Sequence, residues 1–531
     1  MFDSAKLNLI FHNANIITLD PLHPHAKLVS ITNGKILSVG NENELARLKG
    51  GRSKVIDCHG KTIVPGFIDS HVHLSAFGES LVTINLGPHN GIRSISDIQG
   101  KIRQLSQNRP PGEWIRCGGY NEFSLREKRH PNRWDLDVAS SVHPIKVTHR
   151  SGHAHVLNSV ALRMTSISRE TPDPEGGLID RNFITGEPTG LLYGMGKFIS
   201  KSIPPLDSHQ LDQGIVMANR ELLSFGITSI QDASFRNDVA CWERLQRWKY
   251  QGYLKPRVSM MLGIKAFEEY RKKGFSSEIK EEQLRIAGVK IIVDETTGRL
   301  NPRQDELNDL VSVIHHSGFQ AVIHAIEEPA IEAACTAIEY ALQRAPQSDH
   351  RHRIEHCSVC PSSLAKKLAS LGVMVITQPS FIYHSGNRYL ETVPKSQLKS
   401  LYPLATLLSN GVHIAGSSDC PIVPPNPLIG IYSAVSRRSE TGNPVLAQES
   451  ITPLDALHMY TDYAARASFE ENSKGSIAPG KLADMVVLSN DPTTCATEEI
   501  KNIQVDMTIL NGEVVWDKNG LTNNPSLDVR G

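Results

Sequence analysis

Apolar runs and helical segments alternate along most of the chain. From about residue 212 onward, segments with helical periodicity such as DQGIVMANRELLSFG are followed by short apolar runs such as ITSIQDA, VKIIVDE and FQAVIHAIE. These runs are too continuous to leave one side facing solvent, which is typical of parallel strands covered by helices. The alternation indicates an α/β fold, and its length favours a closed (β/α)8 TIM barrel over an open sheet. In such a barrel, chemistry lies at the carboxyl ends of the strands.

The two ends of the chain have a different pattern. Residues 1–64 consist of short β-type runs separated by Asn/Gly turns. Residues 473–531 show the same pattern of short strand-like runs and turns, in SIAPGKLADMVVLSND and VDMTILNGEVVWDKNG. Because chain termini commonly lie close together, we expect one small discontinuous β-sandwich domain, which leaves residues 65–472 for the barrel. Residues 80–205 are rich in Pro, Gly and acids and interrupt the barrel rhythm. We expect them to form an inserted lid subdomain.

Composition excludes several classes of protein. Of the 531 residues, 40% are hydrophobic and 21% charged, which argues against a disordered, collagen-like or coiled-coil chain. The 56 basic residues balance the 56 acidic ones, so no general attraction to nucleic acid or to an anionic membrane is expected. No stretch approaches the ~20 apolar residues that a membrane helix needs. Any function must therefore lie in a local site.

The cysteines and the N-terminal segment favour a cytoplasmic protein. The first residues, MFDSAKLNLIFHNANIITLD, lack the basic region of a secretory signal. Eight cysteines are too sparse for a disulfide scaffold. Cys357 and Cys360 form a C-x-x-C pair, but no second pair follows at zinc-ribbon spacing, so we interpret them as unpaired thiols near a strand end.

One His-x-His pair lies where a metal site is expected. Residues i and i+2 of a strand point to the same face and can bind one metal. Of the four such pairs, only His71/His73 stands directly at the end of an apolar run, TIVPGFIDSHVH. His350/His352 and the neighbouring histidines His315/His316 are expected to be surface or helix-end residues.

Other ligand-type residues end later apolar runs at barrel spacing. Lys290 lies in GVKIIVDE, His324 in AVIHAIE and His356 in HRIEHCS, each just over thirty residues from the next. That spacing corresponds to one strand plus one helix. Asp419, in HIAGSSDC, follows after about two such units, so one strand, VMVITQPS, is skipped. The spacing predicts that these side chains meet at one rim of the barrel.

Taken together, these motifs resemble the amidohydrolase superfamily. The resemblance rests on PGFIDSHVH, the lone lysine in VKIIVDE, the two later strand-end histidines, GSSD and PGKLADMVVL. More narrowly, GHAHVLNSVAL, TQPSF and SSDCPIVPPNPLIGIYSAVSRR resemble the branch that contains N-substituted formamide deformylase. The resemblance implies a distorted barrel with two divalent metal ions. Zinc is the expected metal, and manganese or iron are the alternatives. It implies His71, His73 and Asp419 on one ion, His324 and His356 on the other, and a bridging carboxylated Lys290.

The chemistry of these residue types agrees with that implication. An ammonium buried in an apolar strand costs several kcal/mol or more, which lowers its pKa from ~10.4. The resulting neutral amine can take up CO2, and the carbamate can hold two cations that lower the pKa of a shared water toward ~7. The alternatives are that the Lys290 side chain extends its ammonium to solvent or that it pairs with Asp294 or Glu295. Glu295 differs from the commoner family pattern, in which a glycine follows the aspartate at the position of Asp294. Whether Glu295 is a ligand or shapes the substrate loop stays open.

We therefore expect an enzyme: a hydrolase that cleaves a non-peptide C–N bond of a small molecule, in an amide, N-formyl or cyclic amide group. A metal-bridging hydroxide would attack the carbonyl, with Asp419 as general base and then general acid. The alternatives are a mononuclear-metal deaminase or decarboxylase with unmodified Lys290, and a non-catalytic scaffold. Relatives suggest a homo-oligomer. Candidate substrate-binding residues are Tyr120, His149, His153, Glu295, Arg299, Gln378 and His384.

Overall fold

The chain divides into two compact units. The computed structural model describes residues 8–49, 53–174, 176–272, 280–281, 283–295 and 299–520. The smaller unit is Ser75–Ala218, and the larger unit combines Met1–Leu74 with Asn219–Gly531. The larger unit holds the barrel and two terminal sheets, and the smaller unit holds a sheet of its own.

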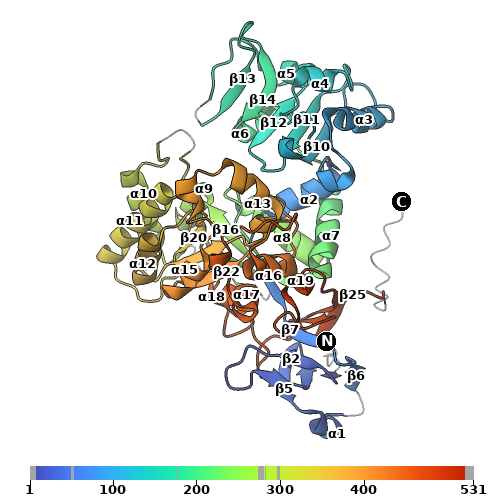
Figure 1. Cartoon of the computed structure of the whole chain (residues 1–531), viewed down its shortest axis with the longest axis vertical. Coiled ribbons are helices and arrows are strands. Elements are labelled where there is room, and N and C mark those ends of the chain that lie inside the picture. The colour runs from blue at the N-terminus through green and yellow to red at the C-terminus, as the bar shows by residue number, and fades with distance from the viewer. Residues whose placement is uncertain are drawn as a thin grey trace. The chain divides into compact units, whose positions relative to one another are not determined.

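Eight parallel strands form an almost closed barrel in the larger unit, which confirms the α/β barrel fold predicted from the alternation (Figure 1). They are buried along nearly their whole length, because helices cover the sheet on its outer side. Their order in the sheet follows the chain: β8 (Phe67–Val72), β15 (Ile227–Asp232), β16 (Arg257–Gly263), β18 (Leu284–Ile292), β19 (Gln320–Ala325), β20 (Arg353–His356), β21 (Met374–Thr377) and β22 (Ile414–Gly416). The short β17 (Lys280–Glu281) pairs with β18 outside this order.

The barrel closes between its first and last strands. The backbone N–H of Asp419 donates to the carbonyl of His71 at 2.9 Å, and that of His73 donates to the carbonyl of Cys420 at 2.8 Å. Val72 and Cys420 form an isolated parallel bridge. Closure therefore brings the His71/His73 pair beside Asp419, although about 350 residues separate them in sequence.

Helices connect successive strands of the barrel. Along its outer surface α10 packs on α11 and α11 on α12 (Figure 1). None of the described helices combines the length and apolarity that crossing a bilayer requires. The helices of this unit are α1 (Leu45–Leu48), α8 (Val239–Tyr250), α9 (Ile264–Lys272), α10 (Gln304–His316), α11 (Glu328–Arg344), α12 (Ser362–Ser370), α13 (Ser380–Thr392), α14 (Lys395–Leu398), α15 (Leu404–Ser409), α16 (Pro427–Ser436), α17 (Pro453–Met459), α18 (Asp462–Arg466) and α19 (Thr497–Ile500).

The two ends of the chain build a pair of sheets with a common core. One sheet has the order β5 (Lys35–Gly40), β4 (Leu28–Thr32), β1 (Asn8–His12), β6 (Ser53–Asp57). The other combines both ends in the order β25 (Glu513–Asp517), β24 (Val505–Leu510), β23 (Met485–Leu488), β7 (Thr62–Pro65), β2 (Asn15–Ile17), β3 (His25–Ala26). Phe11 and Val29 of the first sheet share a buried cluster with Ile63, Met485 and Ile509 of the second. Strand β7 leads directly into β8, the first barrel strand.

The smaller unit contains a six-stranded mixed sheet. Its order is β13 (Leu178–Arg181), β14 (Pro188–Tyr193), β12 (Ala154–Leu157), β11 (Ile145–His149), β10 (Ile115–Tyr120), β9 (Ile84–Asn85). Apolar residues of α3 (Ile95–Ser106) and α4 (Arg133–Asp137) share a buried cluster with this sheet. The unit also holds α5 (Ser159–Met164) and α6 (Gly196–Ser202), while α2 (Leu74–Val82) and α7 (Ser208–Ser224) span its boundaries.

The expectation that His350 and His352 are surface or helix-end residues is wrong. They lie just before β20, and their exposed fractions are 4% and 1%. His352 Nε2 lies 2.9 Å from Nδ1 of His315, and its Nδ1 accepts a hydrogen bond from the backbone N–H of Ala321 at 3.0 Å. Histidines are buried here because each ring has a hydrogen-bond partner at the start of a barrel strand.

Candidate metal centre

Three ligand-type side chains meet where the barrel closes. His71 and His73 lie at the end of β8, and Asp419 follows β22. One ligand atom from each lies within 4.8 Å of the others. Asp419 Oδ1 is 3.1 Å from His73 Nε2 and 3.6 Å from His71 Nε2. The two histidines and the carboxylate thus direct their coordinating atoms toward one place.

These distances fit a bound cation. Zinc bonds to nitrogen and oxygen are about 2.0–2.1 Å long, so tetrahedral ligand atoms lie roughly 3.3 Å apart. Asp419 Oδ1 is buried and, among the described residues, accepts no hydrogen bond in spite of the two nearby nitrogens. A shared cation satisfies all three atoms at once.

Two further histidines lie beside this group. His324 is on β19 and His356 ends β20, and their ring centroids are 4.4 Å apart. The ring of His356 is also 4.9 Å from that of His71. His356 has a φ of +74° and Asp419 a φ of +57°, in the left-handed region that non-glycine residues rarely adopt. Backbone strain of this kind is typical of functional sites.

Lys290 lies on β18 with its ammonium buried. Its side chain is 2% exposed, and among the described residues Nζ has no hydrogen-bond partner. Burial lowers the pKa of Lys290 from 10.5 to about 8, although the charges of Glu355 and Asp419 oppose this change. An unsatisfied amine in a buried polar site has the chemistry to carry a further group, because it is nucleophilic when neutral.

Each of three histidines has a defined partner on Nδ1. His71 Nδ1 bonds to Glu355, His73 Nδ1 lies 3.1 Å from Ser234 Oγ, and His356 Nδ1 lies 2.9 Å from Gln378 Oε1. The oxygens of Glu355 and Gln378 can only accept, so they place a proton on Nδ1 of His71 and His356 and leave Nε2 available as a ligand atom. The candidate Gln378 is therefore fully buried behind His356, and its amide also donates to Ser417 Oγ at 2.9 Å.

Sequence reasoning missed the buried carboxylates around the site. Asp69 on β8 accepts hydrogen bonds from the backbone N–H of Ser418 at 3.0 Å, from the Ser418 hydroxyl and from the backbone N–H of His71. Burial raises the pKa of Asp69 to about 7. These bonds attach the loop before Asp419 to the first strand. A charged residue inside an otherwise buried strand was the signal, both for Asp69 in GFIDSHVH and for Glu355 in HRIEH.

The remaining substrate candidates of the larger unit lie in segments that follow barrel strands. Glu295 follows β18, and its Oε1 accepts a hydrogen bond from the backbone N–H of Glu327 at 3.2 Å. Arg299 is exposed. His384 lies on α13, with its ring centroid 5.1 Å from that of Tyr383.

The other three candidates belong to the smaller unit. Tyr120 is completely buried at the end of β10, and its hydroxyl lies 2.8 Å from His130 Nδ1. Its ring centroid is 5.2 Å from that of His149, whose Nε2 lies 2.7 Å from Glu122 Oε2. His153 is exposed. The structure thus groups Tyr120 with His149 and leaves His153 outside that cluster.

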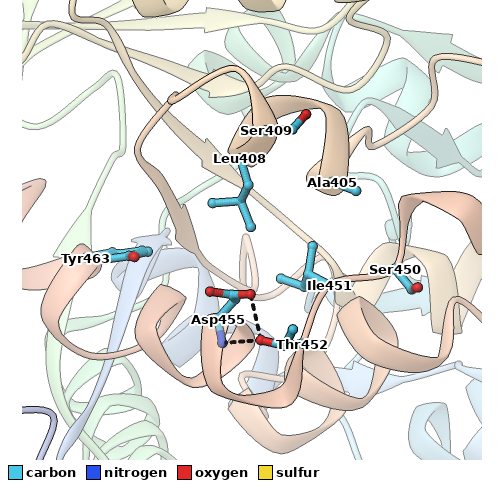
Figure 2. A pocket seen from close by; sticks show the side chains of 8 residues that line it. All are labelled: Ala405, Leu408, Ser409, Ser450, Ile451, Thr452, Asp455 and Tyr463. Atoms are coloured by element: carbon cyan, nitrogen blue, oxygen red, sulfur yellow. Dashed lines mark hydrogen bonds between the residues drawn. The ribbon is translucent and has the colours of Figure 1, made fainter.

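A surface pocket lies between α15, α17 and α18 (Figure 2). None of the candidate metal ligands lines it. Its carboxylate, Asp455, is engaged in capping α17, because Thr452 Oγ1 donates to Asp455 Oδ2 at 2.6 Å and accepts from the Asp455 N–H at 3.1 Å. The carboxylate of this pocket therefore already has a structural role.

An α/β barrel with clustered His, Lys and Asp side chains at the carboxyl ends of its strands defines the class of barrel hydrolases that use metal ions. Comparison with known proteins identifies the family: the model of the amidohydrolase family matches residues 54–516, and the chain belongs to this family. Family members are generally metal-dependent hydrolases.

Individual relatives are similar over most of their length. N-substituted formamide deformylase of Arthrobacter pascens is 29% identical over 544 residues, covering 97% of this chain and 99% of the relative. Protein LONG AFTER FAR-RED 3 of Arabidopsis thaliana is 27% identical over 516 residues, covering 91% and 87%. The crystal structure of an uncharacterized metal-dependent hydrolase from Pyrococcus furiosus has a TM-score of 0.72 at 24% identity, covering 92% and 100%. At that identity the structural likeness shows the fold.

Proposed function

We propose that the protein hydrolyses a non-peptide C–N bond of a small molecule, in an amide, N-formyl or cyclic amide group. The observation that carries the proposal is the convergence of His71, His73 and Asp419 beside the unsatisfied amine of Lys290. The relative named N-substituted formamide deformylase supports this choice of bond. These side chains, together with His324 and His356, would hold divalent metal ions. We propose zinc, with manganese or iron as alternatives.

The metal would polarise the scissile carbonyl and lower the pKa of water from 15.7 toward about 7. Asp419 has the position for proton transfer, because its Oδ1 lies among the ligand atoms and accepts no hydrogen bond among the described residues. Its carboxylate accepts a proton from the attacking water and then donates it to the leaving nitrogen. Water and amide are thus converted to a carboxylic acid and an amine.

We propose further that Lys290 is carboxylated. Its neutral amine adds to CO2, forms an N–C bond and releases one proton, which leaves an anionic carbamate. The unsatisfied, buried Nζ supports this assignment.

A mononuclear centre with unmodified Lys290, suited to a deaminase or decarboxylase, is the second candidate. It is favoured by the observation that only His71, His73 and Asp419 form a close ligand group among the described residues. Metal content separates the two: two ions per chain with bicarbonate-dependent activity support the first, and one ion with no bicarbonate effect supports the second.

A substrate screen tests the function. Zinc- and manganese-loaded protein is assayed with N-formyl compounds, amides, lactams and hydantoins. The Asp419→Asn variant keeps the size of the side chain and loses its basicity, so we expect turnover to fall by 10²-fold or more while much of the metal stays bound. Turnover unchanged in this variant removes Asp419 from the reaction, and no turnover of any compound favours a non-catalytic scaffold.

The proposed substrate contacts are Glu295, Arg299, His384, Tyr120, His149 and His153.

The eight free cysteines support the predicted cytoplasmic location. Association into a homo-oligomer and the absence of nucleic-acid binding remain predictions.

A further inference from the structure

A carboxylate buried behind His71 takes no part in the proposed reaction. Glu355 on β20 is 0% exposed and bonds through Oε2 to His71 Nδ1. On the other side of the same ring, Nε2 lies 3.6 Å from Asp419 Oδ1. The imidazole therefore spans the distance between Glu355 and the candidate metal ligands. When Nδ1–H donates to the carboxylate, the lone pair of Nε2 is directed toward the centre.

A buried arginine compensates the charge of Glu355. Arg353 lies two residues earlier on the same strand, so both side chains point to the same face. Its Nε is 2.7 Å from Glu355 Oε1, and its other nitrogens donate to the carbonyl of Ser70 at 3.1 Å and to Gln231 Oε1. A buried carboxylate without an opposite charge is strongly disfavoured, and the guanidinium offsets part of that penalty.

The backbone departs from strand geometry at the residue that follows. Successive residues of a strand point to opposite faces, so Glu355 and His356 should not both approach His71. The φ of +74° at His356 breaks this alternation, and its ring centroid lies 4.9 Å from that of His71. The consecutive residues Glu355 and His356 therefore both lie beside His71.

We propose that Glu355 is a positioning residue for the metal centre. Its carboxylate fixes the tautomer and orientation of His71, and Arg353 places an opposite charge beside that carboxylate. His73 and His356 have neutral partners on Nδ1, a hydroxyl and an amide, so of these three histidines His71 is the one with a carboxylate partner. This inference rests on the proposed metal site.

Zinc affinity measured by competition with a chromophoric chelator tests the proposal. Glu355→Gln keeps the size of the side chain and one acceptor oxygen but loses the charge, and we expect zinc to bind about 10–100-fold more weakly. The matched control is Asp484→Asn, which removes the charge of another buried carboxylate paired with an arginine, Arg257, at 2.7 Å. This control should lower the melting temperature and leave zinc affinity within about threefold of wild type.

A double variant separates positioning from a merely structural role. Replacing both members of the pair, E355Q/R353Q, removes both buried charges and should restore much of the melting temperature of the metal-free protein. Zinc affinity should stay low, because His71 still lacks its carboxylate. Recovery of zinc affinity together with stability would overturn the proposal, as would wild-type affinity in E355Q. If E355Q does not fold, the double variant is compared directly with wild type.

Two results on the unmodified protein complete the test. If wild-type protein binds none of zinc, manganese and iron, the proposed function itself fails, and the positioning role fails with it. In crystals of the zinc-loaded wild type, His71 should bind the metal through Nε2 with Nδ1 against Glu355, and ligation through Nδ1 would overturn the role of Glu355 alone.

Discussion

Replacing Lys290 by methionine should make the metal-free protein more stable. A tenfold change in a protonation constant corresponds to about 1.4 kcal/mol, so a pKa lowered from 10.5 to about 8 means that the buried ammonium costs about 3 kcal/mol at pH 7. Methionine has a similar length, carries no charge and tolerates irregular packing. The unfolding entropy is about 2.1 cal/mol/K per residue, so for a unit of roughly 390 residues the gain corresponds to about 4 °C.

The pH dependence distinguishes this charge effect from better packing. The folded pKa lies below that of the unfolded chain, so the penalty is complete below about pH 8 and fades as the pH rises toward 10.5. The stability difference between K290M and wild type should therefore shrink from about 3 kcal/mol at pH 7 to about 1.4 kcal/mol at pH 9.5. A packing gain would not change with pH.

The assay is thermal unfolding in chelator and bicarbonate-free buffer, so that neither a cation nor a carbamate compensates the lysine. Zinc should then stabilise wild type more than K290M, because the variant has lost one ligand. A stability difference that is constant between pH 7 and 9.5, or a less stable variant, would refute the reasoning.

Two further predictions concern stability away from the centre. Burial holds the pKa of His352 well below 6.5, so its contribution to stability is complete above pH 6.5 and is lost as the pH falls. Relative to His352→Asn, whose amide oxygen can still accept from Ala321, wild type should lose about 2 kcal/mol between pH 7.5 and 5.0 in urea titrations; an equal loss in both proteins would contradict this. In Gly416→Ala the new Cβ would lie 2.5 Å from Tyr460 Cζ, so differential scanning calorimetry should show a destabilisation of about 1–3 kcal/mol, and an unchanged melting temperature would contradict the close packing.

The barrel was predictable because its signal is periodic. Continuous apolar runs separated by helical segments mark each strand, and spacings of just over thirty residues placed Lys290, His324 and His356 on three successive strands, β18, β19 and β20. The strand that the spacing skips is β21, and Asp419 follows the next one. The sheet of the smaller unit was not foreseen in detail, because its strands are short and lie among Pro- and Gly-rich turns.

The support behind the candidate ligands could not be predicted from spacing. The bond between Glu355 and His71 joins residues 284 positions apart, and it depends on the face to which each side chain points. The position of His356 depends on a left-handed φ that no local pattern indicates. Burial of His350 and His352 likewise depends on partners from α10, from β19 and from the turn after α12.

Anomalous diffraction at the zinc edge, from crystals of the zinc-loaded protein, tests the central claim most directly. We predict a strong peak bounded by His71 Nε2, His73 Nε2 and Asp419, with the Lys290 side chain directed toward it. A peak located elsewhere, or an empty space among these side chains at saturating zinc, would contradict the account.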